Sequence, residues 1–481
     1  MSKRNFILLI IVLVIATSVT LGFLYFRQPT KPAEENGGTN FISQFNPFGN
    51  NTTTPPSVKP PANVSGYQPG GEQETLKLKK ISSMPIAGFT LFSKERLKEV
   101  VATPPQPLPE GEGQKEGAGS GDSISPLLME EGVGGGKRSS LTSTLPQGKG
   151  VKPTTKPAPP LTEFMPALRY VERATGNIYQ TFADKIEERK FSTTIIPMVY
   201  EALFGNNGQS VIMRYLKGET IITFVGNLPK EFLGADTTAS NEIKGTFLPE
   251  NIKDISLSGD ASSIFYLFSS GNNLEDNIIG TTLNLINNKK VQVFDSPFTE
   301  WLSLFPNNKM LSFTTKPSAG IPGYMYAIDP NNKNYNFNKI LGNINGLTTL
   351  TNPNGKLVLY GNDNLSLSVY HTDTKVSDTL GIRTLPEKCV WNKIGDAVYC
   401  GVPKFIGNGQ YPDSWYQGEV SFGDQIWKID IKTGNAKIVA DPATVNGGEE
   451  IDSIKLLMDD GENYLFFVNK KDSFLWELSL K

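Results

Sequence analysis

The feature that most constrains the fold is a unit of four short apolar runs that recurs from Met165 to Lys481. Each unit has two apolar runs around a Gly/Asn/Asp turn, then a loop, a third run bearing Leu, Tyr or Trp, a polar turn and a fourth run. Residues 346–380, GLTTLTNPNGKLVLYGNDNLSLSVYHTDTKVSDTL, show this order most cleanly. The units start at Pro197, Ile252, Phe298, Gly346 and Glu387. Their spacing of roughly 40–55 residues is typical of four-stranded propeller blades.

The chain therefore predicts an all-β fold, a β-propeller of about seven four-stranded blades. The last unit, from Ile451, supplies only three strands, and TLKLKKIS at 75–82 has the alternation of a half-buried strand. We expect this early strand to complete the last blade, because an open sheet edge invites aggregation. Residues 84–92 and 168–182 then form the first blade. Six blades, with 75–93 outside the ring, and a pair of antiparallel sandwich sheets are the alternatives.

Three stretches, NPNGKLVLY (352–360), IWKIDIKTG (426–434) and RYVERATG (169–176), resemble the WD40-like repeat of TolB-type β-propellers. The family's form is a strand, SPDGK, a second strand, LYxxDxxTG and a last strand. This resemblance covers roughly 75–481 apart from one insertion, and it implies a fold without an activity. The sequence is also similar to a group of membrane-anchored bacterial propellers, which implies no activity either. The turns SGDAS and FPNNK depart from the pattern.

The N-terminus predicts a membrane anchor. Residues 6–26 are uncharged and mostly apolar, and as a helix they would cover the roughly 30 Å thickness of the hydrocarbon layer. A cleaved signal peptide is the alternative. Residues 1–5 would form a cytoplasmic tail, so we expect a single-pass protein of the cell membrane that contacts the lipid bilayer through 6–26, with its propeller outside the cytoplasm.

Two segments lack the apolar content of a core. Residues 28–74 predict a disordered linker between the membrane and the propeller domain at 75–481. A second low-complexity stretch, at about 103–160, predicts a disordered insertion within that domain. Helical periodicity is scarce, and 92–101 and 182–190 are the two short candidate helices.

Charge and histidine content exclude several functions. The 46 basic and 48 acidic residues leave a net charge of −2, which argues against a nucleic-acid partner. His371 is the only histidine, so a zinc site lacks a second one, and a solvated surface position is expected for it. A Ser-His-Asp triad would have to use His371, and no G-x-S-x-G motif accompanies it. No motif for a cofactor, a metal or catalysis is present. A pair of carboxylates remains the one catalytic arrangement that this composition allows.

Two cysteines flank a turn in CVWNKIGDAVYC. In a hairpin Cys389 and Cys400 would lie opposite each other, within disulfide range, and a location outside the cytoplasm would permit oxidation. The alternative is a pair of buried thiols.

The candidate partner-binding residues lie in a loop at 402–425, inserted between strands of the unit that starts at Glu387. They are aromatic and acidic side chains in a polar, Gly-rich setting: Tyr411, Asp413, Trp415, Tyr416 and Phe422. Large aromatic residues on a loop are typical of recognition sites. The same rings could instead fold back over the propeller as a local core, which a loop of this length needs in order to be ordered.

These observations favour a binding or scaffold module for a protein, peptide or glycan of the cell envelope. The first alternative is a hydrolase or lyase outside the cytoplasm, which would place carboxylates with raised pKa values together in the largest cavity. The second is a structural spacer with neither a cavity nor an exposed aromatic patch.

Overall fold

The computed structural model describes residues 77–98, 161–231, 242–269, 277–332 and 337–481, all within one compact unit, Gln73–Lys481. The predicted cytoplasmic tail, the anchor, the linker at 28–74 and the insertion at about 103–160 all lie outside these residues. Within the described part of the chain, no helix has the length and apolarity needed to cross a membrane.

Seven sheets of four antiparallel strands form the unit. Blade 1 is β2 (Ile86–Leu97), β3 (Thr162–Glu172), β4 (Ile178–Phe182) and β5 (Arg189–Lys190). Blade 2 is β6 (Val199–Gly205), β7 (Ser210–Lys217), β8 (Thr220–Asn227) and β9 (Lys244–Phe247). Blade 3 is β10 (Asp254–Leu257), β11 (Ser263–Ser269), β12 (Ile278–Asn284) and β13 (Lys290–Ser296). Blade 4 is β14 (Trp301–Asn307), β15 (Met310–Thr315), β16 (Pro322–Ile328) and β17 (Asn338–Asn345).

The remaining three blades complete the chain. Blade 5 is β18 (Thr348–Thr351), β19 (Leu357–Gly361), β20 (Ser366–His371) and β21 (Ser377–Arg383). Blade 6 is β22 (Cys389–Trp391), β23 (Ala397–Pro403), β24 (Asp424–Asp430) and β25 (Ala436–Ala440). Blade 7 is β26 (Ser453–Met458), β27 (Tyr464–Asn469), β28 (Leu475–Ser479) and β1 (Leu78–Lys80). A 3₁₀ helix, η2 (Pro386–Lys388), precedes β22, and a short helix, α2 (Asp413–Tyr416), lies between β23 and β24.

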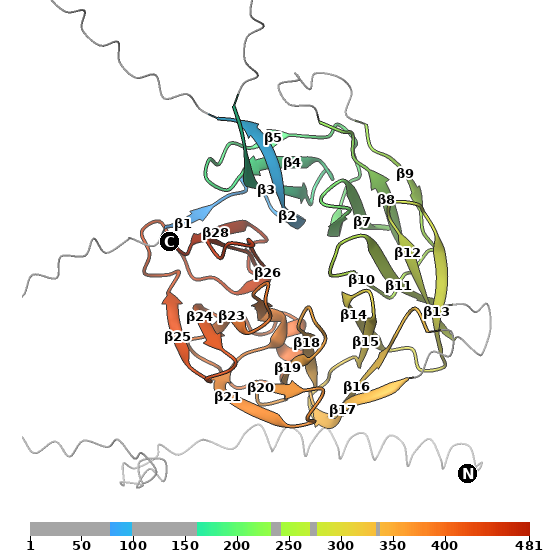
Figure 1. Cartoon of the computed structure of the whole chain (residues 1–481), viewed down its shortest axis with the longest axis vertical. Coiled ribbons are helices and arrows are strands. Elements are labelled where there is room, and N and C mark those ends of the chain that lie inside the picture. The colour runs from blue at the N-terminus through green and yellow to red at the C-terminus, as the bar shows by residue number, and fades with distance from the viewer. Residues whose placement is uncertain (1–76, 99–160, 232–241, 270–276, 333–336) are drawn as a thin grey trace, which may run out of the picture. The chain divides into compact units, whose positions relative to one another are not determined.

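The blades stand around a common centre as a ring, with the fourth strands β13, β17, β21 and β25 at the rim (Figure 1). This arrangement is a β-propeller. The sandwich alternative is therefore excluded, and the count is seven blades rather than six.

The two ends of the propeller domain share blade 7, as the alternation at 75–82 predicts. Leu78 of β1 pairs with Leu478 of β28, and Lys80 pairs with Trp476. The Ile81 amide donates to the Leu475 carbonyl at 2.8 Å, which continues the ladder. Because β1 covers the outer edge of β28, the ring has no open end at this position.

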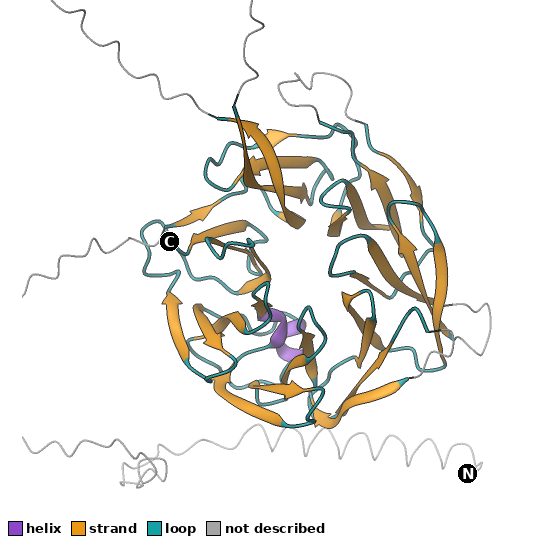
Figure 2. Ribbon diagram, in the orientation of Figure 1, coloured by secondary structure: helices purple, strands orange, loops and turns teal. Residues whose placement is uncertain are grey.

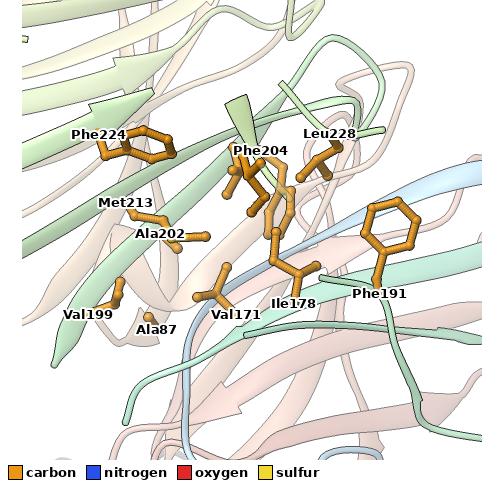
Figure 3. Close-up of a cluster of buried hydrophobic side chains, with 12 residues drawn as sticks. Ala87, Val171, Ile178, Phe191, Val199, Ala202, Phe204, Met213, Phe224 and Leu228 are labelled. Carbon is orange, nitrogen blue, oxygen red and sulfur yellow. The ribbon is translucent and has the colours of Figure 1, made fainter. Parts of the chain in front are cut away.

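The core lies between the faces of adjacent blades. Figure 3 shows Val171 and Ile178 of blade 1 directed toward Phe204 and Met213 of blade 2, all of them buried. The inner strands β2 and β6 approach so closely that a Cβ on Gly88 would lie 1.9 Å from the Ala202 carbonyl oxygen. Glycine is thus the residue that this blade-to-blade contact admits.

Both candidate helices are wrong. Residues 92–97 belong to β2, which pairs with β3 as far as Leu97, and residues 182–190 form the end of β4, a bend and β5. Residues 94–96 carry charged side chains, but they pair with β3 across blade 1, and this pairing makes them part of a strand.

Candidate functional site

The aromatic loop between β23 and β24 folds back onto the ring. The side chains of Tyr411, Trp415 and Phe422 are 4%, 4% and 2% exposed, and they pack with Leu365 and Leu385. These three rings thus form the local core that the sequence offered as the alternative to a recognition surface.

The two other residues of the predicted site are less buried. Tyr416 is 40% exposed, and its hydroxyl donates to Glu387 Oε1. Asp413 is half-buried and accepts a 2.5 Å hydrogen bond at Oδ2 from the Ala319 amide of blade 4. On the other side, Lys470 of the β27–β28 loop donates from Nζ to the Trp415 carbonyl at 2.7 Å. The loop therefore braces blades 4 to 7, and Figure 2 shows its helix near the centre of the ring.

Three charged side chains lie beneath this loop with no exposure to solvent. Lys388 Nζ is 2.8 Å from Asp424 Oδ2 and also contacts Asp452 Oδ1. Asp452 accepts from Trp415 Nε1 at 3.0 Å and from the Phe422 amide at 3.0 Å. Sequence reasoning did not single out Lys388 or Asp452, because nothing in the local sequence around either residue marks it as buried.

The two carboxyl groups of this cluster differ. Burial raises the pKa of Asp424 and outweighs the opposing effect of the Lys388 charge. Burial acts in the same sense on Asp452, but there the Lys388 charge and the hydrogen bonds from Phe422 and Trp415 prevail and lower the pKa. Asp424 is thus the more easily protonated of the two carboxyl groups.

A cavity of about 870 Å³ lies against blades 1 and 2. Five cationic and four acidic side chains belong to its lining, which contains Phe92, Ser93, Lys94, Glu95, Arg96, Leu97, Arg169, Gln180, Thr181, Phe182, Lys185, Glu187, Glu188, Arg189, Asn207, Gln209 and Glu231. Since these residues come from segments far apart in the chain, the fold alone assembles the site.

Arg169 of β3 is the most firmly held of the cations. Its side chain is 4% exposed, and its guanidinium lies 4.3 Å from the Phe191 ring centroid and 4.7 Å from that of Phe92. Nε donates to Gln180 Oε1 at 2.8 Å, and Nη1 donates to the Gly208 carbonyl at 2.5 Å. The remaining nitrogen, Nη2, is thereby aimed at the carboxylate in the cavity.

That carboxylate is Glu231, whose side chain is 12% exposed. Oε2 accepts from Arg169 Nη2 at 3.0 Å and from Lys94 Nζ at 2.6 Å, and Oε1 contacts Arg189. Glu231 therefore acts as an internal anion surrounded by three cationic side chains.

The cations in the cavity disfavour one another's charge. Burial, with the nearby guanidinium groups of Arg189 and Arg169, lowers the pKa of Lys94 to about 7. Burial, reinforced by Arg189, lowers the pKa of Arg169 to about 10. The contact with Glu231 opposes the shift of Lys94, since a neighbouring anion stabilises an ammonium.

Four carboxyl groups with raised pKa values lie outside this cavity. Burial is the leading cause of the raised pKa of Asp254, Glu387 and Asp424, and it raises the pKa of Glu477 to about 7. None of these four carboxyl groups lines the cavity against blades 1 and 2.

The histidine and the two cysteines lie on the strands of blades 5 and 6. His371 Nε2 lies 3.0 Å from Asp378 Oδ2 at the end of β20, partly exposed. Cys389 and Cys400 pair across β22 and β23 and form a disulfide. Among the residues that the structure describes, no cluster of three or more His, Cys, Asp or Glu side chains is arranged to hold a metal ion.

The TolB-type repeat occupies the places that the resemblance implies. Residues 352–356 form the turn between β18 and β19, and residues 431–435 form the turn between β24 and β25. The fold is a β-propeller of seven four-stranded blades. No protein family and no curated protein matches this sequence.

Solved structures with a similar fold are distant in sequence. Oligogalacturonate lyase in complex with manganese is 9% identical, with a TM-score of 0.46 over 66% of this propeller chain and 85% of that chain. Oligogalacturonate lyase from Vibrio parahaemolyticus is 9% identical, with a TM-score of 0.43 over 65% and 85%. TolB from Acinetobacter baumannii is 11% identical, with a TM-score of 0.35 over 64% and 60%.

Proposed function

We propose that this propeller is a binding module that is anchored to the membrane and lies outside the cytoplasm. It binds a carboxylate-bearing protein, peptide or glycan of the cell envelope in the cavity lined by Lys94, Arg169 and Arg189, the cationic cavity. The disulfide between Cys389 and Cys400 supports an oxidising location. The apolar run at 6–26 supports attachment to the membrane.

The observation that carries the proposal is the position of Arg169. A guanidinium that is almost fully buried, with two of its nitrogens bonded to protein oxygens, is fixed before any ligand arrives. Its third nitrogen already holds a carboxylate, that of Glu231. Guanidinium and carboxylate groups form strong charge-assisted hydrogen bonds, so a ligand carboxylate that displaces Glu231 would find its partners in place.

We propose binding rather than catalysis. The carboxyl groups with raised pKa values lie outside the cavity, and its lining suits recognition of an anion. The hydrolase or lyase alternative lacks the feature that would favour it.

Binding titrations of the full chain in detergent micelles test this proposal. The probes are a poly-glutamate peptide and an oligosaccharide of uronic acids, with a neutral oligosaccharide as the reference ligand. Lys94→Met should weaken binding of the acidic probes about tenfold, because it removes one charge-assisted hydrogen bond. Glu231→Gln should strengthen binding, because the internal competitor loses its charge.

Lys316→Met is the matched control, since Lys316 forms an exposed pair with Glu300 on blade 4. It should leave both affinities unchanged. Equal affinities for Lys94→Met, Glu231→Gln and the unaltered chain would refute the cavity as the binding site, whereas a preference for one acidic probe would identify the ligand as peptide or glycan.

A further inference from the structure

The buried charges beneath the aromatic loop form a second arrangement of chemical interest. Lys388 is the last residue of η2, Asp424 is the first residue of β24, and Asp452 immediately precedes β26. All three side chains have zero exposure. One amine and two carboxyl groups are thus held in contact inside the protein.

The surroundings of this group are aromatic. The ring centroids of Trp415 and Phe422 each lie 5.4 Å from Lys388 Nζ. Burial raises the pKa of the neighbouring Asp424 carboxyl group, which makes that group easier to protonate. An amine in contact with a protonated carboxyl group is a pair from which an amide can form.

The hydrogen bonds give the two carboxyl groups different roles. Asp452 accepts from Trp415, Ser421 and the Phe422 amide, the donors that keep it a carboxylate. Asp424 accepts only at Oδ2, from the Ser453 amide and hydroxyl at 2.7 Å each and from Lys388. Its other oxygen, Oδ1, is buried and has no hydrogen-bond partner among the described residues. Asp424 is placed to react and Asp452 to exchange protons.

We propose that Lys388 and Asp424 join in an intramolecular isopeptide bond, with Asp452 as the group that transfers the proton. The Asp452 carboxylate takes one proton from the Lys388 ammonium, and the neutral Nζ attacks Cγ of protonated Asp424. The C–N bond forms as the bond from Cγ to the hydroxyl oxygen breaks. That hydroxyl leaves as water with a second proton from Nζ, and the first proton stays on Asp452. No oxidant or co-reactant is needed.

The bond would resolve an electrostatic cost of the fold. Removing the Lys388 ammonium and the Asp452 carboxylate from water is unfavourable, and their mutual attraction often fails to offset this cost. Condensation converts Lys388 and Asp424 into a neutral amide at the same position. Together with the disulfide at Cys389, it would link β22 covalently to both β23 and β24 of blade 6.

Peptide mapping of the full chain, reduced and digested with trypsin, tests the proposal. An isopeptide bond protects Lys388 from trypsin and joins residues 384–393 to residues 405–428, with the mass of one water missing. Recovery of 384–388 and 389–393 as separate, unmodified peptides would overturn the proposal. A product joining 384–393 to 438–455 would overturn the assignment of Asp424, because that peptide carries Asp452.

Two variants separate the chemistry from folding. Asp452→Asn removes the proton acceptor while leaving Lys388 and Asp424 in place, so the cross-linked peptide should be lost. Lys470→Arg changes a lysine whose Nζ donates to the Trp415 carbonyl and lies over the Trp415 ring, and it keeps the positive charge, so it should keep the cross-link. Retention of the cross-link in folded Asp452→Asn would contradict the role of Asp452.

Discussion

Trp415 is the side chain through which the aromatic loop holds blade 7. Its ring packs against Phe422, and its indole nitrogen donates to Asp452. Trp415→Ala should lower the free energy of unfolding by about 3–5 kcal/mol, because a large buried ring is replaced by a cavity. Urea denaturation at neutral pH measures the change.

Phe405→Ala is the control for this prediction, since Phe405 lies in the same loop and is 78% exposed. Its effect should stay within about 0.5 kcal/mol. Equal denaturation midpoints for Trp415→Ala and the unaltered chain would show instead that the Trp415 ring is free to meet a partner.

The role of these rings could not be decided from sequence. Aromatic residues in a Gly-rich loop are typical both of recognition sites and of loops with their own small core. The deciding contacts come from Leu365, Leu385 and Asp452, which belong to other repeats. The cationic cavity was missed for the same reason, because Lys94, Arg169 and Glu231 lie in three segments and only the fold brings them together.

Glu477 of β28 predicts a pH dependence of stability. It is 1% exposed, opposite Lys79, and Oε2 has no hydrogen-bond partner in the described part of the chain. Burial raises its pKa from 4.5 to about 7. From pH 4.5 to about 7 the unfolded chain loses this proton while the folded chain keeps it, so stability should fall with rising pH by at most about 3 kcal/mol.

Glu477→Gln should remove this contribution, because an amide does not titrate. Unfolding free energies measured across this pH range should therefore fall less steeply for Glu477→Gln than for the unaltered chain. Glu419→Gln, at an exposed carboxylate in the aromatic loop, should keep the original slope. Parallel pH profiles for all three proteins would contradict the prediction.

At the scale of elements, the spacing of the repeats predicted the blades well. Pro197, Ile252, Phe298, Gly346 and Glu387 each lie just before the first strand of a blade. Period-two alternation and turn residues are local signals, so they predict the positions of strands directly from the sequence. The helix predicted at 92–101 was wrong because β2 continues beyond its buried part into charged residues. Those residues form a strand because they pair with β3.

The hairpin β22–β23 carries the next prediction. Reduction of the disulfide between Cys389 and Cys400 should lower the free energy of unfolding by roughly 2–4 kcal/mol, since the unfolded chain gains freedom. The measurement is urea denaturation with and without a reductant. Cys389→Ala/Cys400→Ala should show no further response to the reductant. An unchanged midpoint of the reduced native chain would mean that the bond adds no stability.

At the scale of the whole molecule, ring closure links the two ends of the domain to every blade between them. The first three strands of blade 7 come from the C-terminus and the fourth comes from residues 78–80. Each blade packs against the blade on either side of it. Loss of β1 from blade 7 would therefore weaken the packing of blade 7 against both of its neighbours. This long-range pairing was predictable because the last repeat lacked a strand and the first apolar alternation lacked a partner.

Two truncations measure the contribution of the closing strand. Deletion of residues 1–82 removes Leu78 and Ile81, which are 7% and 3% exposed, whereas deletion of residues 1–74 keeps both. Burying one such side chain contributes about 1.5–3 kcal/mol, so the longer deletion should lower the free energy of unfolding by roughly 3–6 kcal/mol relative to the shorter one. It should also increase light scattering, because β28 would expose an unpaired edge. Equal urea midpoints and equal scattering for the two truncated chains would mean that the ring is held closed without β1.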